Sequence, residues 1–557
     1  MKMRKSFLLF LILPVCITLL LSRIYYLLTP LLLAFIIDAL SSSDISSFRL
    51  CFPILLFSSL ILALSYPLGS FLLGMFRENL IYSTRMQVVK VFSRGDFSAV
   101  STCGSGNFAS VLDTDIPVFF SFLTERLFQL PFDLAMSFFV IFLFFKISPF
   151  FAGLLLSFGI IITILSHVSS RRLREKSHGA QVAKGRLRQF LTETSRGPWV
   201  VKAMCAERWR KKGFEKLQER ETEKSLERHL FSGFVMLWNH SGARVIALAI
   251  LLAGGIAMLD GKISLGMLFF YLTVGPLVFS PFYYFISLVR DYRISSGAYR
   301  RIFSMLNIPT EFSGSGGWVG GRIEFKDIWF SYGDEWVLKG VSFAVEPGEH
   351  VALVGRSGAG KSTLVNLLLR FYEPQRGKIR VGGMDVRDID LGVLRGRIGM
   401  VPQDVFIFSG TLRENILMGM DVDEERLEKV IRMAGIDRIL EKLPEGLDSV
   451  VGEGGYGLSG GERQRVGIAR VLLREPEVVI FDEAMSALDS YSEMKIKEFI
   501  EDWGKGRTFV VIAHRWSTVR DFPSVLFLHE GRVIKSTHEE LMRIKEYREM
   551  FKGEEGK

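Results

Sequence analysis

The chain has 557 residues, 49% of them hydrophobic, and a net charge of +10. It is too long for one ordinary domain, and its mean hydropathy of +0.27 is high for a soluble protein. The positive charge does not indicate nucleic-acid binding, because a dense block of Lys and Arg at 171–212 lies between apolar stretches, as in a cytoplasmic loop of a membrane protein.

Six apolar stretches follow one another in the first 300 or so residues. Each supplies most or all of the ~20 residues that a helix needs to cross ~30 Å of hydrocarbon. The sequence therefore predicts an α-helical six-span transmembrane domain over residues 1–306. The stretches are Phe7–Ile37, Phe48–Met75, Val118–Phe145, Phe150–Ser166, Leu230–Leu259 and Leu265–Val289.

The links between these stretches alternate between short and long, basic segments. The long ones are Arg77–Arg94, Arg171–Arg228 and Arg290–Arg301, and the N-terminal MKMRK is basic as well. Basic links lie on the cytoplasmic side of a membrane. We therefore expect a multi-pass protein of the cytoplasmic membrane with both termini in the cytoplasm.

The long links contain many helix-forming residues, which predicts that spans two to five continue far into the cytoplasm as helices. Two interruptions fall at the cytoplasmic ends of these helical extensions, at 101–115 with Gly104 and Gly106, and at 193–207 with Gly197 and Pro198. Because Gly and Pro break helices, these segments are the predicted turning points. They are also the predicted contacts with a cytoplasmic domain.

A few ionisable residues fall within or near the predicted spans: Arg23, Asp133, His240 and Arg244. Charges at such depth face a protein interior or a water-filled path. The sequence leaves open whether they line a substrate cavity or pair between helices. The sequence also leaves open whether the aromatic run Phe279–Phe285 packs between helices or contacts substrate.

A segment rich in Gly and Ser, within residues 307–320, separates the apolar part from the rest. This composition is typical of a linker. The alternating run Arg322–Trp329 that follows predicts a strand. We therefore expect a second domain over residues 321–557.

The second domain contains a strand, Val351–Val354, a glycine-rich loop and a helical pattern, Thr363–Leu369. This context, with G-x-x-x-x-G-K-S between strand and helix, predicts an α/β P-loop nucleotide-binding domain. Glycines let backbone N–H groups close around phosphates, and the helix dipole adds to the attraction. The sequence thus predicts binding of ATP with Mg²⁺, by Gly355, Ser357, Gly358, Gly360, Lys361, Ser362 and Thr363.

A second buried strand, Val478–Phe481, ends in two carboxylates. Asp482 is the predicted Mg²⁺ ligand, together with Ser362, and Glu483 is predicted to orient or deprotonate the attacking water. His514 follows a further apolar run and is either a γ-phosphate contact or an ordinary polar strand end. Tyr332 follows the first predicted strand and is a candidate for stacking on adenine.

The segment LSGGE, Leu458–Glu462, places Ser459, Gly460 and Gly461 at the start of a helix. Such a start forms a second phosphate-binding nest. Because the glycine loop already holds the phosphates within one domain, this nest is most useful to a nucleotide bound by a second subunit.

With these motifs the chain resembles an ABC (ATP-binding cassette) exporter half-transporter. The resemblance implies that Gln403 is the Q-loop glutamine that links the metal site to the membrane domain, and that Asp489, in the D-loop, is one of the nucleotide-binding residues. It also implies that His514 is the H-switch, that Glu453 marks the X-loop, and that the loops at 101–115 and 193–207 are coupling helices. Glu483, His514 and Gln403 are then the catalytic group, with Ser362, Gln403 and Asp482 at the metal.

The implied function is ATP-driven export, or outward flipping, of an amphipathic drug, lipid or peptide by alternating access in a dimer. A homodimer is favoured, because the catalytic motifs look intact, and a heterodimer stays open. The alternatives are an exporter-type fold used for import, a non-pumping channel or regulator, and a soluble ATPase acting on DNA or ribosomes. Two residues depart from the family pattern, Glu462 in place of the commoner Gln and Met485 beside Asp482.

Overall fold

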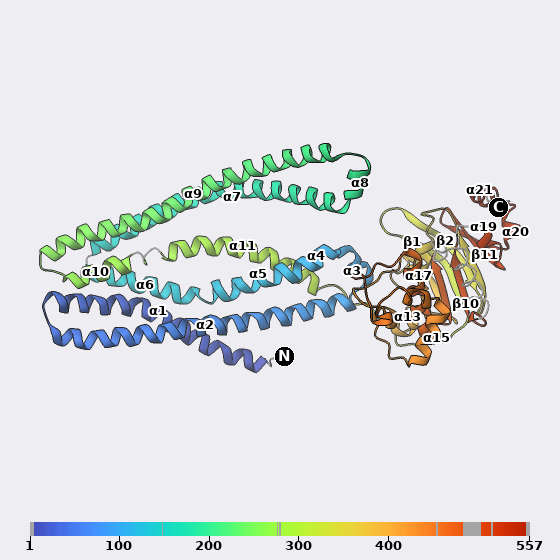
Figure 1. The fold of residues 1–557 in the computed structure, drawn as a ribbon, viewed down its shortest axis with the longest axis horizontal. Coiled ribbons are helices and arrows are strands. Elements are labelled where there is room, and N and C mark those ends of the chain that lie inside the picture. The colour runs from blue at the N-terminus through green and yellow to red at the C-terminus, as the bar shows by residue number, and fades with distance from the viewer. Residues whose placement is uncertain are drawn as a thin grey trace. The chain divides into compact units, whose positions relative to one another are not determined.

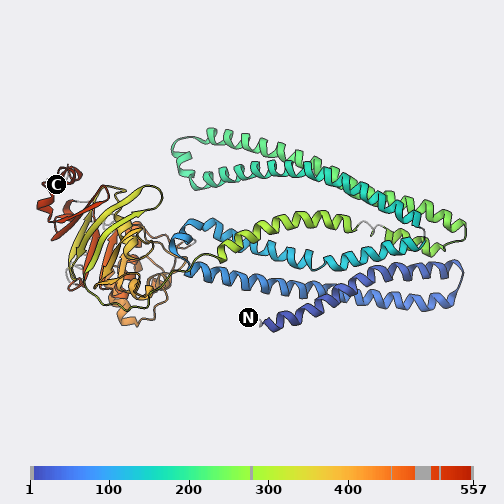
Figure 2. The same cartoon turned by 180° about the vertical axis from the view of Figure 1, so that it is seen from behind.

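A computed structural model describes residues 5–147, 149–275, 277, 280–452, 455–482, 503–513 and 516–552. The chain forms two compact units (Figures 1 and 2). The first unit comprises Met1–Ser93 and Cys103–Asn307, and the second comprises Arg94–Thr102 and Ile308–Lys557. The short segment Arg94–Thr102, at the end of helix Ile45–Arg94, thus belongs to the second unit.

The first unit is helical, and the described residues of the six apolar stretches fall on its helices, apart from a turn at 128–129 and residues 275 and 277. Three helices, α2, α7 and α9, contain 50, 48 and 53 residues, so the predicted long extensions are observed. At 1.5 Å per residue, each is about 75 Å long. The helices are α1 (Lys5–Ser41), α2 (Ile45–Arg94), α3 (Phe97–Cys103), α4 (Ser105–Ser110), α5 (Ile116–Ser121), α6 (Leu130–Ile147), α7 (Pro149–Arg196), α8 (Pro198–Ala203), α9 (Glu207–Leu259), α10 (Leu265–Val274) and α11 (Ser280–Leu306).

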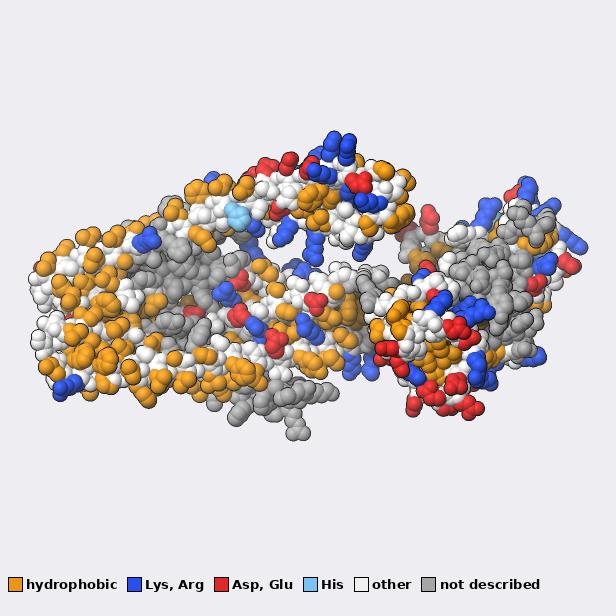
Figure 3. Space-filling model, in the orientation of Figure 1, with side chains coloured by type: hydrophobic (Ala, Val, Ile, Leu, Met, Phe, Trp, Pro, Cys, Tyr) orange, Lys and Arg blue, Asp and Glu red, His pale blue; other side chains and the backbone are white. Residues whose placement is uncertain are grey.

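Two helical segments of the described part are long and apolar enough to cross a membrane: α2, and the run Gly106–Lys146 that extends from α4 to α6. Proline occurs inside α2 at Pro53 and Pro67 without ending the helix, as membrane helices allow. Figure 3 shows hydrophobic side chains covering the part of this unit around the α1–α2 hairpin, and charged side chains gathering toward α8. The exposed apolar surface fits a lipid environment.

The first predicted turning point contains α3 and α4, with breaks after Arg94 and at Gly104, whose φ is +70°. The chain therefore begins to turn after Arg94, before the start of the predicted segment 101–115. At the second turning point α7 ends at Arg196, and α8 precedes the start of α9 at Glu207.

Two π-helical turns lie at the start of the third helical segment: η1 (Val111–Asp115) precedes the predicted span Val118–Phe145, and η2 (Phe122–Leu127) falls within it. Asp115 in η1 accepts two hydrogen bonds from the Arg301 guanidinium of α11, at 2.7 and 2.6 Å. The Asp115 side chain is 4% exposed. This bidentate pair ties η1, just before the third predicted span, to α11.

The ionisable residues predicted within the spans have different surroundings. Asp133 is half-buried in the first turn of α6, and Arg244 in α9 is exposed. The side chains of Arg23 and His240, and those of the run Phe279–Phe285, lie outside the residues whose side chains the structure describes.

The second unit contains two main sheets. The larger has the order β12-β11-β3-β10-β9-β6, with β12 antiparallel to β11 and the other strands parallel. The smaller is antiparallel, in the order β2-β1-β4-β5. The strands are β1 (Ile323–Ser331), β2 (Trp336–Val345), β3 (His350–Val354), β4 (Arg376–Val381), β5 (Met384–Asp385), β6 (Ile398–Val401), β9 (Val478–Asp482), β10 (Thr508–Ile512), β11 (Ser524–His529) and β12 (Arg532–Ser536), with the short pair β7 (Gly410–Thr411) and β8 (Val450–Val451).

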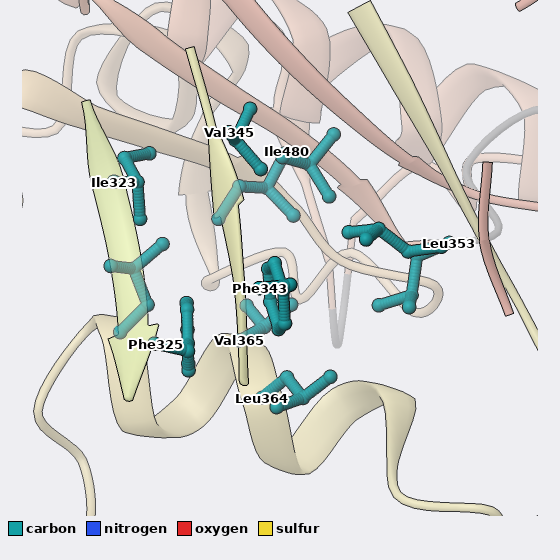
Figure 4. A pocket seen from close by; sticks show the side chains of 11 residues that line it. Ile323, Phe325, Phe343, Val345, Leu353, Leu364, Val365 and Ile480 are labelled. Atoms are coloured by element: carbon teal, nitrogen blue, oxygen red, sulfur yellow. The ribbon is translucent and has the colours of Figure 1, made fainter. Parts of the chain in front are cut away.

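The helix that follows the glycine loop, α12 (Lys361–Leu368), packs between the two sheets. Its Leu364 and Val365 line a small apolar cavity of about 30 Å³ together with Phe325 of β1 and Ile480 of β9 (Figure 4). Side chains from both sheets therefore fix this helix, and with it the glycine loop. The remaining helices are α13 (Leu391–Arg397), α14 (Leu412–Leu417), α15 (Glu424–Ala434), α16 (Asp437–Leu440), α17 (Gly460–Arg474), α19 (Trp516–Val519), α20 (His538–Leu541) and α21 (Lys545–Met550).

The predicted linker is bound to the second unit along its length. Gly316 donates its N–H to the Asp388 carbonyl at 2.8 Å and accepts from the Asp390 N–H at 2.9 Å. A Cβ on Gly314 would lie 2.2 Å from the carbonyl carbon and oxygen of Asp388. The glycines of this segment therefore permit close backbone approach.

Candidate nucleotide-binding site

The glycine loop, Gly355–Gly360, connects β3 to α12. Gly358 and Gly360 have φ values of +77° and +107°, which side chains other than glycine rarely adopt. The Lys361 ammonium donates to the carbonyl oxygens of Gly355 at 2.8 Å and Arg356 at 3.2 Å. The loop is therefore closed around a lysine that is only 7% exposed.

Two oxygen-bearing side chains meet beside this loop. The Ser362 hydroxyl, from α12, donates to the Asp482 carboxylate at the end of β9 over 3.3 Å. Because β3 and β9 are parallel strands of one sheet, their carboxyl ends lie at the same edge. The structure thus brings together two residues that are 120 positions apart in the sequence.

Tyr332 follows β1 and lies beside α12. Its ring is half exposed at 54%, and its hydroxyl is 3.3 Å from that of Thr363. The ring of Tyr372 packs edge-on against it, with centroids 5.0 Å apart. An exposed aromatic face beside the start of the phosphate-binding helix can stack on a planar base.

The second phosphate-binding element is the start of α17. Ser459 is its N-cap and forms a capping box with Glu462: the Ser459 hydroxyl accepts from the Glu462 N–H, and the Glu462 carboxylate accepts from the Ser459 N–H. Gly460 and Gly461 form the first turn. Within the described residues of one chain, no hydrogen bond joins Ser459, Gly460 or Gly461 to the glycine loop.

The remaining predicted site residues divide into two groups. Gln403 is exposed and follows β6, the neighbour of β9. Glu483, Asp489 and His514 lie outside the described residues, so their roles stay predictions. The same holds for Glu453 and Met485.

Two family models match this chain: the ABC transporter transmembrane region over residues 11–282, and the ABC transporter over residues 338–486. An ATP-dependent lipid A-core flippase of Alkalilimnicola ehrlichii is 36% identical over 395 residues, which are 69% of this chain and 67% of that protein. The chain belongs to the ABC transporter family. A protein of the same description from Burkholderia pseudomallei is 34% identical over 381 residues, 67% of this chain and 64% of that one.

A solved structure extends the likeness to the whole chain. A bacterial Atm1-family ABC exporter with ATP bound superposes with a TM-score of 0.80 at 25% identity, covering 99% of both chains. This ABC transporter is therefore an integral membrane protein with the exporter fold, and its nucleotide-binding domain couples ATP hydrolysis to transport. The predicted family, fold class and enzyme activity are confirmed.

Sequence reasoning missed three residues beside the ABC transporter's site. Tyr372 packs on Tyr332, Phe97 packs on Tyr372, and Lys442 binds Glu462. The aromatic pair FY at 371–372, soon after the phosphate-binding helix, was the available signal for Tyr372. No sequence signal pointed to Phe97 or Lys442, because each partner comes from a distant segment.

Proposed function

We propose that two copies of this chain form an exporter that moves a lipid-like amphipath outward across the cytoplasmic membrane. The observation that carries the proposal is the presence of two phosphate-binding elements, the glycine loop and the start of α17, without a hydrogen bond between them in the described part of one chain. Two chains arranged head to tail give each element a partner. Each ATP is then held between the glycine loop of one chain and Ser459–Gly461 of the other.

Within one such site, the residues have separate tasks. Tyr332 stacks on the adenine, and the glycine loop with Lys361 and Thr363 binds the phosphates. Glu483, directly after the last residue of β9, orients or deprotonates the attacking water. His514 contacts the γ-phosphate, and Asp489 of the D-loop contributes to nucleotide binding; both roles come from the family resemblance.

The oxygens of Ser362 and Asp482 fit a Mg²⁺ ion. Adjacent ligands in an octahedral shell with bonds of ~2.0–2.1 Å are about 3 Å apart, close to the 3.3 Å between these atoms. Among the described residues no three His, Cys, Asp or Glu side chains gather in one place. Gln403 is the third proposed protein ligand of this ion. An Mg²⁺ ion held by these residues would supply the positive charge that offsets the charge developing on the phosphates.

The segments 101–115 and 193–207, which contain α4 and α8, are the proposed coupling helices. Residues 1–306 form the transmembrane domain, 307–320 the linker and 321–557 the nucleotide-binding domain, with both termini in the cytoplasm. Closure of the two nucleotide-binding domains on ATP turns the membrane cavity outward, and hydrolysis resets it. A heterodimer with a second half-transporter is the competing assembly.

The substrate class follows from the relatives described as lipid A-core flippases. The test is ATP hydrolysis by the purified chain in nanodiscs of phosphatidylcholine, with and without an acylated anionic glycolipid, beside Glu483→Gln. We expect hydrolysis that the glycolipid stimulates and that Glu483→Gln abolishes. Hydrolysis unchanged by Glu483→Gln would overturn the assigned mechanism, and its absence in the well-folded, ATP-binding wild type would overturn the homodimer. Stimulation by a drug or peptide alone would overturn the lipid assignment.

A further inference from the structure

Glu462 is bonded through both carboxylate oxygens at the start of α17. Oε2 accepts the Ser459 N–H at 2.8 Å, and Oε1 accepts the Lys442 ammonium at 2.8 Å. Lys442 lies 20 positions earlier, just after α16. The Glu462 side chain is 17% exposed and that of Lys442 is 72% exposed, so the ammonium reaches in from solvent to an inner carboxylate.

The capping role of Glu462 does not need a charge, because Gln can accept the same N–H in a capping box. The charge matters for another reason. The start of a helix attracts phosphate through free N–H groups and the positive end of the dipole. A carboxylate in the first turn opposes that attraction unless a cation neutralises it.

Glu462 is ionised at physiological pH. Burial raises its pKa, but the Lys442 ammonium and the Ser459 N–H outweigh burial and lower it to about 2. The neighbouring Arg463 does not supply the compensating contact, because its guanidinium donates to the Leu458 carbonyl at 2.8 Å. Among the described contacts, Lys442 makes the ion pair with Glu462.

We infer that Lys442 is a positioning residue of the composite ATP site: it neutralises Glu462, so that Ser459–Gly461 can receive the phosphates of the ATP bound to the partner chain. The inference rests on the proposed two-chain site. Lys442 acts through Glu462 and does not itself contact the nucleotide.

The experiment compares KM for ATP and kcat in nanodiscs for the wild type and for variants at the two positions. Lys442→Met leaves the carboxylate uncompensated, and we expect KM to rise about fivefold, the upper range for one partly exposed charge pair, with kcat little changed. Glu462→Gln keeps the cap and removes the charge, so KM stays at or below the wild-type value. Glu462→Gln combined with Lys442→Met restores the low KM, and Lys442→Arg keeps it.

Lys429→Met, at an exposed lysine of α15, is the matched control and leaves KM unchanged. If Lys442→Met leaves KM unchanged, or if the double variant is no better than Lys442→Met alone, the inference is overturned. If Lys442→Met lowers the melting temperature but Glu462→Gln does not reverse any rise in KM, the pair has a structural role only. Loss of hydrolysis in Glu483→Gln, measured in parallel, tests the proposed function separately.

Discussion

The ring of Phe97 stacks on the ring of Phe371, with centroids 4.5 Å apart and planes inclined by 26°. Phe371 comes three residues after the end of α12, and Tyr372 touches both Phe97 and Tyr332 edge-on. Phe97 lies in α3, just after the 50-residue helix α2. Aromatic contacts thus connect the segment that follows α2 to the proposed adenine site.

We expect Phe97→Ala to weaken the stimulation of ATP hydrolysis by substrate about two- to tenfold, because an aromatic pair is worth about 0.5–1.5 kcal/mol. Basal hydrolysis should change less, since the glycine loop is untouched. The comparison is with Phe312→Ala, at a phenylalanine that is 70% exposed. Equal stimulation in the wild type and both variants would show that the stack carries no coupling.

Replacement of Lys361 by Ala should reduce ATP hydrolysis by about 10²–10³-fold, the loss expected when one positioned donor is removed from a developing negative charge. The same change removes the ammonium that holds the Gly355 and Arg356 carbonyls, so weaker ATP binding should accompany it. Hydrolysis and binding of a fluorescent ATP analogue are measured together. Lys326→Ala, at an exposed lysine of β1, is expected to behave as the wild type.

The ion pair of Asp115 with Arg301 predicts an asymmetric response to mutation. Arg301→Met leaves a nearly buried carboxylate without its cation and should destabilise the protein by about 1–3 kcal/mol. Asp115→Asn leaves the arginine, whose side chain is 58% exposed, free to meet water, and should cost less. Thermal inactivation midpoints in detergent give the order, and a larger effect of Asp115→Asn would contradict it.

The bound linker offers a matched pair of glycines. Gly314→Ala should release the segment, because its Cβ would lie 2.2 Å from Asp388 backbone atoms, whereas a Cβ on Gly317 meets nothing within 4 Å. Hydrogen exchange of residues 313–321 should therefore accelerate in Gly314→Ala and stay unchanged in Gly317→Ala. The same rate in both variants would mean that the linker is not held there.

The lowered pKa of Glu462, about 2 in the folded chain against an ordinary value of 4.5, gives a pH dependence. A carboxyl whose pKa falls on folding contributes stability above its unfolded pKa, and this contribution is lost as the pH drops toward the folded value. The difference in melting temperature between wild type and Glu462→Gln should therefore be constant from pH 8 to about pH 5.5 and change below about pH 4.5. A difference that already changes between pH 8 and 6 would point to another group.

Sequence alone predicted the glycine loop and its neighbouring strand, because both depend on local spacing. It also predicted the long helices, in which Pro53 and Pro67 cause no break because the helix lies in an apolar setting. It did not predict the π turns at Val111–Asp115 and Phe122–Leu127, which no local composition marks. It also missed the ion pair of Lys442, since such a contact depends on how separate elements pack.

The separation of Lys361 from Ser459 has a genetic consequence. In the proposed dimer, each chain supplies its glycine loop to one ATP and its α17 start to the other. A chain with Lys361→Ala paired with a chain with Ser459→Arg therefore concentrates both defects in one site and leaves the other site intact. Two alleles that are each inactive alone should complement each other in part, whereas two alleles with defects in the same element should not.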